Sequence, residues 1–144
     1  MAKYNFRLQR VLDIRDVELE KAQHELYQVR QKEKKIEQKL TEAEQKLESL
    51  FDYIRKNNLS VTENIRTREY IKKQQERVRE VKKELANHKE VVKQYKENLI
   101  EKKQAKEKIK KIKEKKSTAF YKEFLRKEQK EIDELSLRMS QQGV

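Results

Sequence analysis

LQRVLDIRDVELEKAQHELYQVRQKEKKIEQKLTEAEQKLESLFDYI, residues 8–54, carries apolar side chains at alternating steps of three and four residues. A sustained repeat of this kind places them on one stripe of a helix and is typical of a coiled coil. Heptad position a holds Leu12, Leu19, Leu26, Leu40, Leu47 and Ile54, and position d holds Ala22, Val29, Ile36, Ala43 and Leu50. An isolated helix stabilised by ion pairs needs no leucine at this interval. We therefore predict a helix over about residues 5–56 that packs against a second helix.

A second apolar repeat follows in a different phase. Its members are Ile71, Val78, Val81, Leu85, His88, Val92, Tyr95 and Leu99. Between the two repeats, Asn57 and Asn58 are poor helix formers, and Ser60 with Glu63 has the spacing of a capping box. These residues predict a turn over about 57–61 and a second helix over about 62–141.

The change of phase favours an all-α fold, an antiparallel two-helix coiled-coil hairpin with a longer second helix, as a single domain over residues 1–144. A parallel homodimer is the alternative, but it would keep one register throughout. Pairing Leu47 with Ile71, and Leu26 with Val92, leaves roughly 30 residues after Ile109 without a partner from the first helix. The hairpin is then a rod in which the second helix overhangs.

Two polar residues of the seam, Glu33 and His88, fall near each other in this pairing. A contact between them would fix the alignment of the helices, although the favoured interpretation is that both side chains reach solvent. His24 is expected on the outer face. Two histidines on opposite helices, with no cysteine, do not support a zinc site.

The composition argues against an enzyme. Of 144 residues, 34% are hydrophobic and 44% are charged, and there is no proline or cysteine. Such a chain has little material for a large core, a phosphate-binding loop or thiol chemistry. No nucleophile with a base is apparent, so we predict no catalytic residues, no metal and no cofactor. No apolar run approaches a membrane span or a secretory signal, which predicts a cytoplasmic protein.

The net charge of +12 favours an acidic partner, and residues 101–116 concentrate this charge. They hold nine lysines against three glutamates, a surplus of +6. Phosphate binding is one interpretation, with steep salt dependence. However, no aromatic side chain alternates with the lysines and arginine is absent, so a solvated face or one that docks on an acidic protein is favoured over nucleic acid.

The start of the chain reads FRLQRVLDIR at residues 6–15, and RKEQKEIDEL stands near its end at residues 126–135. Both stretches resemble the terminal motifs of the FliJ family of flagellar export proteins, and the second is the more specific. The resemblance implies a non-enzymatic component of the flagellar type III export apparatus, with a coiled coil similar to the central stalk of rotary ATPases. In this family the end with both termini enters the hexameric ring of the export ATPase FliI.

The same resemblance implies the partners and their sites. FliI ring assembly, a link to the export gate protein FlhA and escort of export chaperones are expected, at the cytoplasmic face of the membrane and with membrane contact through partners alone. The residues implied in ring binding are Phe6, Arg7, Leu8, Arg10, Val11, Leu12, Arg126, Gln129, Lys130, Asp133, Glu134 and Leu135. Those implied in gate binding are Leu50, Tyr53 and Tyr70, near the turn. Asn57 and Gln74 depart from the family there, because relatives carry larger side chains.

Two other functions remain open from the sequence alone. The lysine-rich segment suggests a coiled coil that binds nucleic acid, and the heptads suggest a scaffold or cytoskeletal coiled coil. The first predicts steep salt dependence of binding to DNA or RNA. The second predicts self-association in one register.

Overall fold

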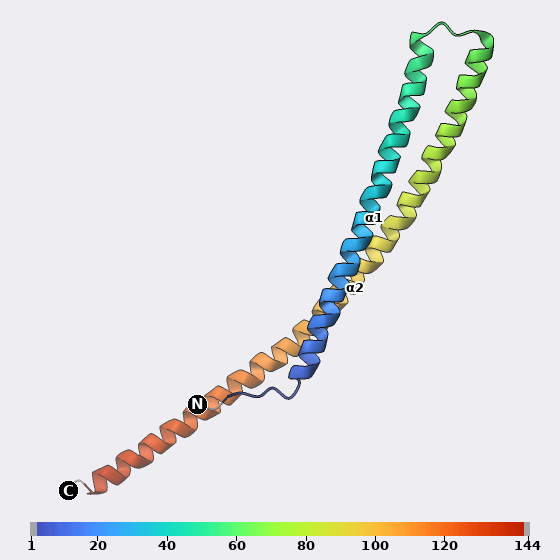
Figure 1. Ribbon diagram of the computed structural model, residues 1–144. Helices are drawn as coiled ribbons and strands as arrows, with labels where there is room; N and C mark the ends of the chain where they lie inside the picture. The colour runs from blue at the N-terminus through green and yellow to red at the C-terminus, as the bar shows by residue number, and fades with distance from the viewer. Residues whose placement is uncertain (1–2, 143–144) are drawn as a thin grey trace. The chain divides into compact units, whose positions relative to one another are not determined.

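The computed structural model describes residues 3–142, and its two helices are α1 (Gln9–Lys56) and α2 (Val61–Gln142). Figure 1 shows the turn that joins them. The predicted all-α hairpin with a longer second helix is confirmed, and the described residues contain no strand. Contacts within the chain define two units, one from Met1–Glu20 with Ile100–Val144 and the other from Lys21–Leu99. We call them the terminal unit and the turn unit; the single-domain organisation stays a prediction.

The core of the turn unit is the predicted seam. Ile36 on α1 is 4% exposed and Val81 on α2 is 1% exposed. Every other seam residue of this unit is buried or half-buried. Burial of this apolar stripe is the main source of stability for helices with so few hydrophobic residues.

Two hydrogen bonds fix the register of α1 against α2 in the turn unit. The carbonyl of Val29 accepts a hydrogen bond from His88 Nε2 at 2.7 Å, and that of Ala43 accepts one from Gln74 Nε2 at 3.0 Å. The order of these contacts along the two helices is antiparallel. The first of these bonds corrects the favoured interpretation that the His88 side chain reaches solvent: the ring is half-buried and binds the backbone carbonyl of Val29, and within the described residues it forms no hydrogen bond with Glu33.

The turn between the helices has the expected cap. Ser60 precedes α2, and its hydroxyl accepts a hydrogen bond from the backbone N–H of Glu63 at 3.2 Å. At the other end of the turn, the Asn57 side-chain amide donates a hydrogen bond to the backbone carbonyl of Tyr53 at 3.0 Å, which gives this carbonyl of the last turn of α1 a partner. Both contacts occupy backbone groups that helix ends leave unpaired.

The start of the terminal unit differs from the prediction. α1 begins at Gln9 and not near residue 5, because the preceding residues pack in a non-helical conformation. The Tyr4 ring lies 5.4 Å from that of Phe120 and 6.3 Å from that of Phe6, measured between centroids. Phe6 is 7% exposed. Aromatic packing onto α2 therefore overrides the helical preference of this segment.

Candidate protein-binding surfaces

Two of the six candidate residues of the N-terminal motif, Arg7 and Arg10, are exposed to solvent. Phe6 and Leu12 are buried, and Leu8 and Val11 are half-buried. The four apolar candidate residues thus pack within the terminal unit, and the motif offers a partner the two arginines together with the 51% exposed side chain of Ile14.

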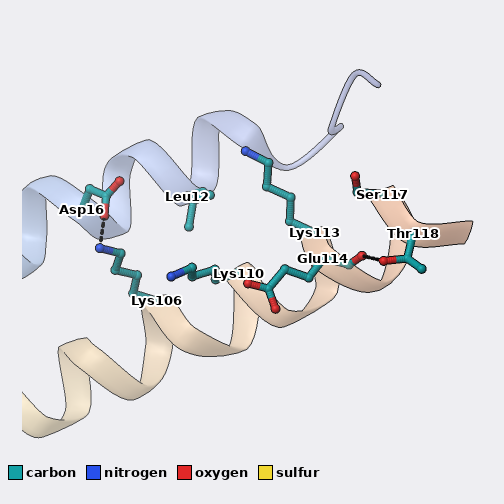
Figure 2. A pocket seen from close by; sticks show the side chains of 8 residues that line it. All are labelled: Leu12, Asp16, Lys106, Lys110, Lys113, Glu114, Ser117 and Thr118. Carbon is teal, nitrogen blue, oxygen red and sulfur yellow. Dashed lines mark hydrogen bonds and ion pairs between the residues drawn. The ribbon is translucent and has the colours of Figure 1, made fainter. Parts of the chain in front are cut away.

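Polar contacts join the start of α1 to the lysine-rich segment of α2. Lys106 forms an ion pair with Asp16 at 2.6 Å, and Lys113 donates a hydrogen bond to Gln9 at 2.7 Å. Glu18 accepts a hydrogen bond from Arg15 at 3.0 Å. Between the helices lies a cleft of about 520 Å³, shown in Figure 2. It is lined by Leu12, Asp16, Lys106, Lys110, Lys113, Glu114, Ser117 and Thr118.

The C-terminal motif lies where α2 has passed its last contacts with the start of the chain. Phe124 is half-buried, and every described residue from 125 to 142 is exposed. The polar contacts of the motif stay within α2: Arg126 binds Glu123 at 2.7 Å, and Gln129 donates to Asp133 at 3.0 Å. All six candidate residues of this motif are therefore available to a partner.

An exposed apolar stripe runs through the C-terminal motif. We define the C-terminal stripe as Tyr121, Leu125, Ile132, Leu135 and Met139, which are between 48% and 72% exposed. Steps of four, seven, three and four residues place them on one side of α2. An unpaired stripe with coiled-coil spacing is a surface that another protein can cover.

The turn side carries a second group of exposed apolar residues. Tyr53 and Tyr70 are 49% and 63% exposed, whereas Leu50 is half-buried. Gln74, where a larger side chain was expected, is occupied by its hydrogen bond to Ala43. The two tyrosines therefore offer rings to a partner, while Leu50 and Gln74 mainly serve the pairing of the helices.

Comparison with known protein families identifies the chain. The family model described as Flagellar FliJ protein matches residues 4–143, nearly the whole sequence. The chain belongs to the FliJ family. FliJ proteins are components of the flagellar export apparatus, so this chain functions in flagellar biogenesis and protein export. No curated protein and no solved structure matches it.

The family match includes both terminal motifs of this FliJ family member. Several other residues of the candidate surfaces were not identified from the sequence. Leu125, Ile132 and Met139 belong to the C-terminal stripe, and Val61 and Ile65 are 79% and 55% exposed near the turn. The spacing of the stripe is a signal for the first three, because it continues a three-four repeat along α2 beyond the residues that pair with the start of α1. The residues near the turn have no comparable pattern.

Within residues 3–142, no helix has both the length and the apolar character needed to cross a membrane. The same residues contain no group of three or more side chains that could hold a metal ion.

Glu18→Gln in this FliJ protein is expected to lower the thermal midpoint near neutral pH and to have no effect in acid. The pKa of Glu18 lies below its ordinary 4.5, chiefly because of the hydrogen bond from Arg15, with the charge of Lys102 adding to the effect. A lowered folded-state pKa gives stability that is present above about pH 4.5 and is lost as the pH falls through the folded-state value.

The measurement is thermal unfolding followed by circular dichroism at about pH 7 and about pH 2. Glu48→Gln is the control, because Glu48 is exposed and has no ion pair within the described residues. An equal shift of the midpoint at both pH values would contradict the assignment to the charge of Glu18.

Proposed function

We propose that this chain is a non-enzymatic stalk of the export apparatus that enters the hexameric ring of the ATPase FliI through its terminal unit. The observation that carries the proposal is the family match over residues 4–143. Two features of the structure support it. The terminal unit contains both terminal motifs, and it exposes the charged residues and the C-terminal stripe by which a ring of subunits can hold a helix pair.

The exposure of each candidate side chain indicates its role in the contact with the ring. Arg7 and Arg10 provide charge from the N-terminal motif, and Arg126, Gln129, Lys130, Asp133 and Glu134 provide polar contacts from the C-terminal motif. Leu135 provides the apolar contact, with Ile132 beside it in the stripe. Phe6, Leu8, Val11 and Leu12 act by holding α1 against α2 so that the two motifs stay in one unit.

The turn unit is proposed to bind the gate protein FlhA. Tyr53 and Tyr70, with Phe51, are its exposed aromatic residues near the turn, and aromatic rings are preferred anchors of protein interfaces. With one unit on the ATPase and the other on the gate, the chain links the two and promotes ring assembly. Export chaperones are proposed as further partners. The site of action is the cytoplasmic face of the membrane, reached through these partners.

The test is binding of the purified chain to FliI and to the cytoplasmic part of FlhA. We expect the chain to bind the FliI ring and to stimulate ATP hydrolysis. Tyr53→Ala with Tyr70→Ala is expected to weaken FlhA binding about tenfold or more and to leave FliI binding unchanged. Tyr27→Ala is the control, since Tyr27 is 61% exposed but lies far along α1 from the turn. A chain that neither binds FliI nor changes its hydrolysis would refute the proposed function.

A further inference from the structure

The lysine-rich segment, residues 101–116, has half the net charge of the chain. It lies outside both terminal motifs, residues 6–15 and 126–135. Three of its nine lysines contact side chains of α1, namely Lys102, Lys106 and Lys113. These contacts stabilise the terminal unit. They leave six lysines without a structural role in the pairing of the helices.

We call these six the outer lysines. They are Lys103, Lys108, Lys110, Lys111, Lys115 and Lys116. All are exposed, and none forms an ion pair with another residue of the described chain. Like charges held this close along a helix repel one another. A partner with negative charge relieves this repulsion, which gives the segment a physical preference for an acidic surface.

The positions of the outer lysines restrict the shape of that surface. At about 100° per residue, they spread over roughly two thirds of the circumference of α2. The remaining side faces α1, as the contacts of Lys106 and Lys113 show. A flat or rod-shaped partner touches one side of a helix and leaves the other lysines unused. The distribution therefore favours a partner that surrounds the helix pair.

The start of the chain also carries positive charge where it packs beside the lysine-rich segment. Lys113 binds Gln9, and the exposed Arg7, just before α1, and the exposed Arg10, on α1, lie on either side of Gln9 in the sequence. Of the three lysines in the cleft of Figure 2, Lys106 forms an ion pair with Asp16, Lys113 binds the uncharged amide of Gln9, and Lys110 forms no ion pair within the described residues. Positive charge is thus available around the terminal unit and not on one face.

From this charge, exposure and distribution, we infer that the outer lysines bind acidic side chains on a protein surface that encloses the terminal unit. The inference rests on the proposed function, in which that surface is the inner wall of the FliI ring. Exposed ion pairs of this kind raise the rate of association and set the alignment, and their strength falls as salt screens them. The outer lysines then guide the chain into the ring, and the C-terminal stripe holds it there.

The test compares two triple variants of the full chain that change the charge equally. Lys108→Glu with Lys111→Glu and Lys115→Glu reverses outer lysines on the side of α2 away from α1. Lys35→Glu with Lys39→Glu and Lys46→Glu reverses exposed lysines of the turn unit. Affinity for the FliI ring is measured over a series of salt concentrations. We expect the first variant to bind about tenfold more weakly at low salt and with a smaller salt dependence, and the second to bind within about twofold of the unchanged chain.

A glutamine version of the first variant, at Lys108, Lys111 and Lys115, keeps the test valid if reversed charges disturb α2, because glutamine is a good helix former. It is expected to show the same loss to a smaller degree. Equal affinity and equal salt dependence in all variants would overturn the inference while the proposed function stands. If the unchanged chain does not bind FliI at all, the proposed function itself fails.

Two further probes decide the class of partner. Phosphatidylcholine vesicles with phosphatidylglycerol present a flat anionic surface, and a short DNA duplex presents phosphates. We expect both to bind the unchanged chain more weakly than FliI does at the same salt. Tighter binding to either one, lost in the first variant, would overturn the inference of an acidic protein surface.

Discussion

Val81→Asp is expected to unfold the turn unit. Val81 is 1% exposed in the seam between α1 and α2, so aspartate there loses the apolar contacts and places a carboxylate without a partner among apolar side chains. Substitutions of this kind cost about 3–5 kcal/mol of the free energy of unfolding. A small unit with a narrow two-helix core has about that much in total. Circular dichroism is expected to show a large loss of helicity.

The matched control is Val61→Asp. It makes the same substitution in the same unit, but Val61 is 79% exposed at the first position of α2. A carboxylate near a helix N-terminus is favourable, so the unfolding free energy is expected to stay within about 0.5 kcal/mol or to rise slightly. If both variants keep full helicity and the same thermal midpoint, the pairing of the two helices within one chain is wrong.

Ile132→Asp combined with Leu135→Asp is expected to abolish function without unfolding the protein. The two side chains are 55% and 56% exposed in the C-terminal stripe, and no partner within the described chain covers them. If the FliI ring covers them, two charged residues at an apolar contact weaken binding by about 3 kcal/mol, which is a loss of more than a hundredfold. Affinity for FliI and stimulation of its ATP hydrolysis measure the effect, and swimming motility reports it in cells.

Leu137→Asp is the control for this variant. Leu137 is 63% exposed and lies two residues after Leu135, about 200° around the helix, so it is outside the stripe. We expect it to bind FliI nearly as well as the unchanged chain. Equal losses in both variants would show that the whole end of α2 is involved and not the stripe. No loss in either would remove the C-terminal motif from the ring contact.

The pairing of the helices was predictable because its signal is periodic. A residue's place in a three-four repeat determines the face of the helix on which it lies, whatever the rest of the chain does. Ile36 and Val81 were assigned to the seam in this way and are buried. The phase change between the two repeats likewise marked the turn, where Ser60 caps α2.

The candidate surfaces were only partly predictable. The terminal motifs were found through their resemblance to a family, and that resemblance does not separate residues that meet a partner from residues that support them. Phe6 and Leu12 are buried, whereas Leu135 is exposed. The spacing of Ile132 and Leu135 indicates a stripe, but a stripe is exposed or buried according to whether another helix reaches it.

The sequence by itself determined two helices, the seam that joins them and the turn between them, because helix formation and amphipathic spacing are local properties of the chain. The tertiary structure alone decided where α1 begins, since the packing of Tyr4 against Phe120 joins residues more than a hundred positions apart. It also divided the lysines of residues 101–116 into those that hold α1 and those that face outward. Which side of a charged helix is covered depends on the partner helix, and local sequence does not contain that information.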